Sequence, residues 1–540
     1  MKQNFFRLIC LVLVCILLTG CVVDSDRYSE IVNKLENQTH LDITPYGEMV
    51  YARPDMAALE QVLTEACEVA AGKDLPAIIQ GIYDFYDAYD LFYTNYSLAD
   101  IRYSCDLTDS YWEAECNFCA ENSPRVDAMM EELFYSLAKS PCLSQLESEK
   151  YFGAGYFDSY QGENNWDATF TAMLEEQSAL VSRYYELAGI GGEFEAGSEE
   201  YYAACYGDMA QILVDLILLR QDMAVYWGYD DYNQFAYDFY HYRDYDVADT
   251  QAYLDAIRSE LVTLYEDVNR SGLWNNAFPY AAEADTYAYV EQTANAMGGM
   301  VEEAFLALDQ GGLYDIRYGE NKYPSSFEVY LTSYYVPFVF MSPSMTTYDY
   351  LVFAHEFGHF CNDYASYGSY AGVDVLEFFS QGMEYLSLCY GSTYDYLTKM
   401  KMADSLCMYV EQAAYAEFEM RMYGIPREEL TVDALLALYE EVACSYGFES
   451  IGYDPREFVT VTHYYTNPLY IISYVVSNDA AMQLYQLEQE TPGAGLSVFE
   501  ENLTTGESYF LSFLASAHLE SPFTKGRIQE VRKTFEAILG

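Results

Sequence analysis

The sequence predicts a mainly α-helical fold that contains one small β-sheet, and three observations support this fold class. From Met56 onward, apolar residues recur at three- and four-residue spacing, most clearly in Met209–Tyr226 and Val410–Tyr423. One segment, Tyr334–Met341, has the composition of a strand, and its Pro337 is expected only at an edge or a bulge. The 540 residues include only 32 Gly and 14 Pro and show no solenoid repeat, which excludes collagen-like and repeat architectures.

The chain is too long for one small domain and is strongly acidic. It has 85 acidic and 26 basic residues, for a formal charge of −59. Nucleic acid is therefore not an expected partner, because its phosphates need Lys or Arg for neutralisation. We interpret the excess of acidic residues as a solvated surface. The glycine pairs Gly191-Gly192, Gly298-Gly299 and Gly311-Gly312 are predicted breaks between helices.

Residues 1–20 are predicted to be a lipoprotein signal peptide. Lys2 and Arg7 flank the start of the apolar run Leu8–Leu18, which is too short to span a bilayer. The segment then ends in Leu-Thr-Gly-Cys, which resembles a bacterial lipobox whose cysteine, Cys21, is lipidated. An ordinary signal peptide or an uncleaved anchor is the alternative.

Lipidation of Cys21 would anchor the protein on the outer, extracytoplasmic side of a bacterial cell membrane. The polar residues 21–45 would then form a tether. Ten cysteines follow Cys21, so disulfides are compatible with this compartment. Cys116 and Cys119 have C-x-x-C spacing, but no second pair follows, and we interpret them as structural or reduced.

The segment His355-Glu356-Phe357-Gly358-His359 carries the chemistry that the sequence indicates most clearly. Two His residues at i and i+4 lie on one helical face, where both imidazoles can reach one Zn²⁺. Glu356 lies beside the metal and is a candidate general base. Its neighbours are apolar, so the helix is expected to be buried, where unpaired polar side chains would be costly.

A catalytic zinc site needs a third protein ligand. A second helix is predicted over Val375–Tyr390, capped by Asp374, whereas Thr346 or Thr347 is expected to cap the first helix. Glu377, Gln381 and Glu384 share one face of the second helix. From spacing alone, either Glu377 or Glu384 could be the third ligand.

Stabilisation of a reacting carbonyl oxygen requires hydrogen-bond donors. One segment near the C-terminal end is dense in such donors, namely His463, Tyr464, Tyr465, Tyr470 and Tyr474. Because the chain contains 58 tyrosines, this signal is weak from the residue types alone.

Taken together, these residues resemble the thimet oligopeptidase and oligopeptidase F family of zinc metallopeptidases. The family has a His-Glu-Phe/Leu-Gly-His helix followed by a helix with Glu-x-x-Ser-x-x-x-Glu, which Glu377–Glu384 matches. The resemblance spans roughly 170–514. The stretches that also resemble the oligopeptidase F branch are Leu218–Arg220, Trp227–Tyr229, Gln412–Glu419 and His463–Tyr470. One departure is Asn362, where the family commonly has another His.

The resemblance implies specific roles for these residues. Glu377 becomes the third zinc ligand beside His355 and His359, and Glu384 helps to orient the ligands without binding the metal itself. His463 and Tyr470 become the transition-state donors, with Tyr474 as a further candidate. The strand Pro337–Met341 is placed where the family's edge strand pairs with the substrate backbone.

The resemblance also implies a fold and an activity. The fold would consist of two helical lobes around a deep substrate channel, with a small β-sheet beside the zinc helix. We expect an N-terminal helical region over 46–200 and a metallopeptidase catalytic region over 201–540. The expected activity is that of a zinc metalloendopeptidase with one Zn²⁺ per chain, acting on short unstructured peptides. A non-catalytic peptide-binding lipoprotein and an exopeptidase of related zinc fold are the alternatives.

Overall fold

The computed structural model describes residues 43–540 except 149, 163–165, 192, 193, 195, 196, 277, 369, 370 and 392–394. The predicted signal peptide 1–20, Cys21 and all but the last three residues of the tether 21–45 lie outside the described residues. At the start of the described chain, Ile43 and Tyr46 pack against the protein core.

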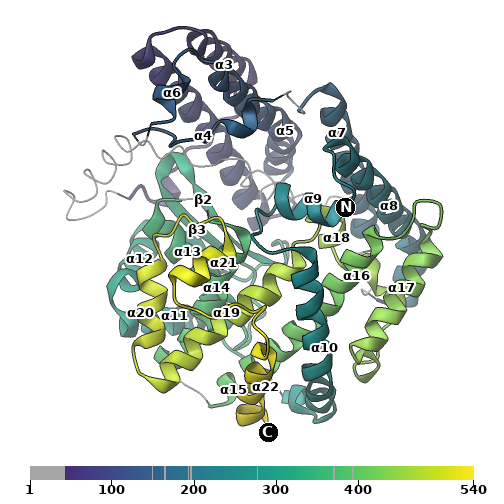
Figure 1. Ribbon diagram of the computed structural model, residues 1–540. Helices are drawn as coiled ribbons and strands as arrows, with labels where there is room; N and C mark the ends of the chain where they lie inside the picture. The colour runs from purple at the N-terminus through teal and green to yellow at the C-terminus, as the bar shows by residue number, and fades with distance from the viewer. Residues whose placement is uncertain are drawn as a thin grey trace.

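The N-terminal helices form a lobe with its own hydrophobic core (Figure 1). The three long helices of this lobe are each preceded by an Asp whose side chain accepts hydrogen bonds from backbone N–H groups of the first turn. These N-cap residues are Asp55, Asp74 and Asp109. The elements of this lobe are α3 (Met56–Ala70), α4 (Leu75–Cys105), α5 (Ser110–Ala138), α6 (Leu143–Leu146) and η3 (Asp158–Tyr160). The preceding turn η2 (Tyr46–Glu48) packs on the larger core through Tyr46.

A larger core joins the remaining helices. The elements before the sheet are α7 (Ala168–Gly191), α8 (Glu199–Tyr226), α9 (Tyr232–Phe239), α10 (Val247–Arg270), η4 (Leu273–Asn276), α11 (Glu283–Met297) and α12 (Gly299–Gly311). The predicted glycine breaks are confirmed, since α7 ends at Gly191, Gly298 separates α11 from α12, and Gly312 follows α12 in a left-handed conformation.

Helices also make up the C-terminal half, which confirms the predicted fold class. Its elements are α13 (Asp349–Ser366), α14 (Val373–Tyr390), α15 (Asp395–Cys407), the π-turn η6 (Met408–Gln412), α16 (Ala413–Tyr423), α17 (Val432–Ser445), η7 (Phe448–Ser450), η8 (Pro455–Thr460), α18 (His463–Thr466), α19 (Ile471–Glu490), α20 (Ala494–Asn502), α21 (Phe510–Ser516) and α22 (Arg527–Leu539).

The small sheet has three strands in the order β1-β3-β2 and packs on α13. The strands are β1 (Tyr314–Asp315), β2 (Ser326–Leu331) and β3 (Val336–Met341). β3 begins two residues later than predicted, because η5 (Thr332–Tyr334) and Tyr335, with φ of 55°, form the turn from β2.

The prediction that Pro337–Met341 is an edge strand is wrong. β3 is the central strand, β1 and β2 are the two edge strands, and α13 packs on β2 and β3. Pro337 is tolerated there because β1 pairs only with Val339 and Phe340, so that Pro337 faces a partner strand on one side, at Tyr330.

The two helices that carry the metal-ligand motif pack directly on each other. Gly358 of α13 permits this approach, because a Cβ at that position would overlap the Phe379 carbonyl and lie 2.6 Å from the Ser380 Cα of α14. The glycine in His-Glu-Phe-Gly-His therefore sets the distance between the His pair and the carboxylates of α14.

Both predicted caps are wrong. The residue before α13 is Tyr348, and the carboxylate of Asp349 instead accepts hydrogen bonds from the backbone N–H groups of Ser344 and Thr346. α14 starts after Gly372, so that Asp374 lies inside its first turn. Asp374 is buried there and accepts a hydrogen bond of 2.8 Å from the Tyr245 hydroxyl.

Among the described residues, α8 is long and apolar enough, by length and composition, to cross a membrane. Its apolar side chains lie in the large core, with Met209, Leu213 and Ile217 fully buried, which is typical of a core helix.

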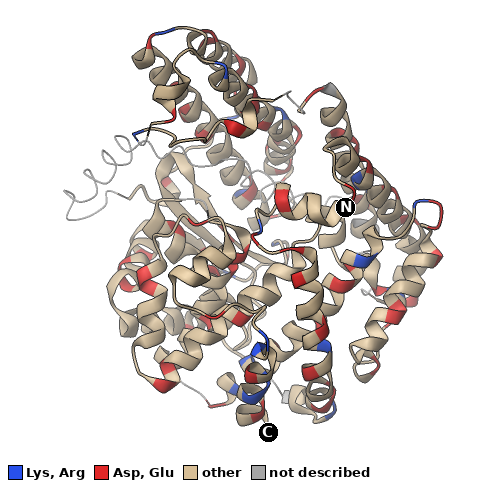
Figure 2. Cartoon of the chain, viewed as in Figure 1, with Lys and Arg blue, Asp and Glu red and all other residues tan. Residues whose placement is uncertain are grey.

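All ten cysteines of the described part of the chain are reduced thiols, and Cys116 and Cys119 are buried. Figure 2 shows acidic residues spread over the N-terminal lobe and over the helices of the larger core.

Candidate metal centre

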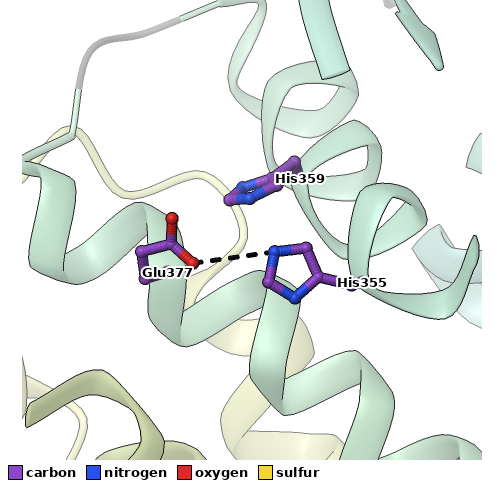
Figure 3. A group of neighbouring side chains, drawn as sticks. All are labelled: His355, His359 and Glu377. Carbon is purple, nitrogen blue, oxygen red and sulfur yellow. Dashed lines mark ion pairs between the residues drawn. The ribbon is translucent and has the colours of Figure 1, made fainter. Parts of the chain in front are cut away.

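The structure brings His355, His359 and Glu377 together, as Figure 3 shows. One ligand atom of each residue lies within 4.8 Å of the others. The two imidazoles project from the same side of α13, and Glu377 faces them from α14. His355 Nε2 is 3.7 Å from Glu377 Oε2.

These three donors suit a divalent cation such as zinc. Ligand atoms held 2.0–2.2 Å from one tetrahedral ion lie about 3.3 Å apart, which is close to the separation of the His355 and Glu377 atoms. Glu356, Glu377 and Glu384 are all buried, with exposed fractions of 7%, 4% and 6%. Three carboxylates buried this closely need compensating positive charge, which a bound dication would supply.

The two His residues have opposite electrostatic environments. Burial alone would lower the pKa of His355, but the hydrogen bond and charge of Glu384 raise it to about 9. Burial and the neighbouring His355 hold the pKa of His359 well below its usual value. His359 is therefore ready to offer a lone pair, whereas a cation must displace a proton from His355.

Glu356 lies next to the ligand His355 but outside the three-ligand group. Burial, with a further contribution from Glu377 and Glu384, raises the pKa of its carboxyl to about 7, although His355 acts in the opposite direction. A bound dication would lower this pKa by favouring the carboxylate. With the dication bound, Glu356 is therefore a carboxylate beside the ligands, in the form that can accept a proton.

Glu384 contacts His355 from the side opposite Glu377. His355 Nδ1 lies 2.9 Å from Glu384 Oε1, and Lys401 Nζ of α15 lies 2.7 Å from Glu384 Oε2. The predicted shared face of α14 therefore supplies two contacts to one imidazole. Lys401 is not among the site residues predicted from the sequence, because an isolated lysine in a helix carries no sequence signal for such a contact.

Tyr470 lies directly against the proposed ligand. Its hydroxyl donates a hydrogen bond of 2.6 Å to Glu377 Oε1, across 93 residues of sequence. Its ring centroid is 5.7 Å from that of His463. His463 Nε2 lies 3.3 Å from the Tyr474 hydroxyl, and burial lowers the pKa of His463 to about 4. His463 is therefore neutral at physiological pH and can donate a hydrogen bond without titrating.

Of the remaining donor candidates, Tyr464 and Tyr465 are fully buried and have partners elsewhere. The Tyr464 hydroxyl donates to the Tyr415 carbonyl, and the Tyr465 hydroxyl donates to the Met209 carbonyl. These two tyrosines therefore serve packing.

Three buried polar side chains hold the backbone of the segment that carries His463 and Tyr470. Fully buried Arg220 donates to the carbonyls of Tyr464 and Tyr465. Glu419 accepts from the Leu469 N–H at 2.8 Å, and His241 Nε2 lies 2.8 Å from the Pro468 carbonyl. The resemblance included Arg220 and Glu419 within matching stretches, and their roles became visible only in three dimensions.

Asn362, at the position where the family commonly has His, connects α13 to the end of α20. Its side-chain amide donates a hydrogen bond of 2.8 Å to the Leu503 carbonyl, and the residue is fully buried. The substitution therefore falls at a packing contact outside the three-ligand group.

Known proteins share this architecture. An oligoendopeptidase F structure aligns with a TM-score of 0.78 and 20% identity, covering 92% of this chain and 98% of the other. PZ peptidase A, solved with an inhibitor, aligns at 0.79 and 17%, covering 92% and 99%. An oligoendopeptidase F structure from Bacillus anthracis aligns at 0.75 and 19%, covering 92% and 98%.

In sequence, the N-terminal part of the chain matches a known family. No curated protein matches the chain. Residues 46–165 match the family described as the peptidase M3 N-terminal domain, which corresponds to the N-terminal lobe of α3–α6. The motifs indicated a resemblance to the thimet oligopeptidase and oligopeptidase F family. This match, together with the oligoendopeptidase F fold over nine-tenths of the chain, confirms that resemblance.

Proposed function

We propose that the protein is a zinc-dependent oligopeptidase that hydrolyses internal bonds of short, unstructured peptides. The observation that carries this proposal is the convergence of His355, His359 and Glu377 on one point, with Glu356 beside them. The arrangement provides three ligands and a general base, which is the chemistry that metal-assisted peptide hydrolysis needs.

Each residue has a defined task in this mechanism. When bound, zinc supplies Lewis-acid polarisation of the scissile carbonyl and of the attacking water. Glu356 accepts a proton from that water on its carboxylate and returns it to the leaving amine. His463 donates to the developing oxyanion, and Tyr470, whose hydroxyl now binds Glu377, donates there or holds the ligand in place.

The substrate class rests on the fold and on the relatives. The substrate channel that the family resemblance implies would admit short peptides and exclude folded proteins, and structural neighbours are named oligoendopeptidases. Retention of Glu356 argues against a pure peptide-binding role, which needs no base. An exopeptidase would in addition need a charged anchor for a peptide terminus.

Metal analysis combined with turnover of a quenched peptide library tests the proposal. We expect about one zinc per chain and cleavage at internal bonds. Trimming of single residues or dipeptides from a terminus would replace it with the exopeptidase alternative. Tight peptide binding by zinc-loaded protein without any cleavage would replace it with the non-catalytic lipoprotein.

We expect His463→Ala and Tyr470→Phe to lower kcat by roughly 10²–10³ with little change in zinc content, because a lost oxyanion donor acts mainly in the transition state. Zinc content and peptide cleavage are measured in parallel on each variant. Because Tyr470 touches Glu377, a zinc loss confined to Tyr470→Phe would assign Tyr470 to ligand holding. Unchanged kcat in both variants would contradict the donor assignment.

We also propose that the protein is anchored by lipid on Cys21 to the outer face of a bacterial membrane. The support is the short apolar segment that ends in Leu-Thr-Gly-Cys. Cys21→Ser is expected to abolish metabolic labelling with a fatty acid and either to release the protein or to leave its signal uncleaved. Unchanged fatty-acid labelling and membrane anchoring of Cys21→Ser would refute Cys21 as the lipidated residue.

A further inference from the structure

The partly buried His355 and two buried side chains form a chain of contacts that leads away from the metal centre across three successive helices. His355 of α13 contacts Glu384 of α14 at 2.9 Å, and Glu384 contacts Lys401 of α15 at 2.7 Å. The two contacts use different oxygens of Glu384, Oε1 for the imidazole and Oε2 for the ammonium group. The carboxylate is therefore held from both sides.

Lys401 occupies an unusual position for a lysine. It is fully buried in a chain that has only 26 basic residues. Lysine is almost never buried unless it is paired, because its ammonium group loses its hydration. Its close ion pair is with Glu384, since Asp404 lies farther away at 3.9 Å and the Tyr385 ring centroid at 4.9 Å.

The orientation of His355 depends on this pair. Nδ1 lies 2.9 Å from Glu384 Oε1 and is the nitrogen that donates to this oxygen, which leaves Nε2, facing Glu377, as the nitrogen for the metal. We propose that Lys401 is a positioning residue for the metal centre, which fixes the Glu384 carboxylate so that His355 presents Nε2 to the metal. This inference rests on the proposed zinc site.

Removal of the lysine would leave Glu384 Oε2 buried without its cation. The carboxylate would then be held from one side only and could rotate, which weakens its hold on the Nδ1–H group. Loss of a group that orients a ligand typically costs 10–100-fold in metal affinity. Because Lys401 acts one step farther away, we expect a loss of about tenfold, near the lower end of this range.

The experiment measures zinc affinity by titrating metal-free full-length protein in competition with a chromophoric chelator. The variants are Lys401→Met, Glu384→Gln and the double variant, with circular dichroism and thermal unfolding to check the fold. Lys399→Met is the matched control, since it removes the same charge from the same helix two residues away. We expect Lys401→Met to bind zinc about tenfold more weakly and Lys399→Met to match the wild type.

The double variant separates positioning from packing. If Lys401 acts through Glu384, adding Lys401→Met to Glu384→Gln should change zinc affinity by less than about twofold, because the group that it positions is already lost. The double variant buries no unpaired carboxylate, so this comparison holds even if Lys401→Met alone does not fold.

Two results would overturn the inference. One is wild-type zinc affinity in folded Lys401→Met, and the other is an equal loss in both backgrounds, which would make the lysine a packing residue only. Wild-type protein that binds zinc but cleaves no peptide would refute the proposed function and leave this inference standing. Wild-type protein that binds no zinc would refute both.

Discussion

Glu356→Gln is expected to keep zinc and the fold yet lose nearly all peptide hydrolysis. Gln has the same size and keeps a hydrogen-bond acceptor, but it cannot take a proton from the attacking water. Loss of a general base costs on the order of 10²–10⁴ in rate, or about 3–5 kcal/mol of transition-state stabilisation. The loss should be at the upper end, because the same carboxyl also protonates the leaving amine.

The measurement is cleavage of a quenched peptide by the purified variant, with zinc content determined on the same sample. Glu320→Gln, at an exposed position outside the metal centre, is the matched control and should retain wild-type rates. A Glu356→Gln protein that cleaves near the wild-type rate would rule out the assigned base. Loss of zinc in this variant would instead place Glu356 among the ligands.

His359→Ala is expected to reduce the zinc content to background and to abolish turnover with it. His359 supplies one of three ligand atoms, and burial with the neighbouring His355 holds its pKa low, so that its lone pair is available at neutral pH. For Glu377→Gln we expect weakened rather than abolished zinc binding, because both imidazoles remain.

Metal analysis after dialysis checks both variants against a histidine control. His518→Asn removes an exposed His whose φ of 57° asparagine tolerates, and it should keep full zinc. Full zinc occupancy in His359→Ala would refute the proposed ligand set. Background zinc in His518→Asn would show that the protein loses metal for reasons unrelated to the centre.

Features that depend on local spacing could be predicted from the amino-acid sequence alone. Helical periodicity predicted the mainly α fold, and the i, i+4 spacing of His355 and His359 put both rings on one side of α13. The same reasoning placed Glu377 and Glu384 on one face of α14, where both reach His355. Residues one or two turns apart are related by helix geometry alone, so these relations survive whatever the rest of the fold does.

Packing between distant segments determines which of these groups meet and which side chains hold them. Spacing left Glu377 and Glu384 equivalent, and they differ only because opposite nitrogens of His355 face them. The start of α14, the central place of β3 and the contact of Tyr470 with Glu377 depend on packing between distant segments. Lys401 depends most clearly on this packing. A lysine in a sequence is normally expected at the surface, and Lys401 joins the metal centre only because α13, α14 and α15 pack together.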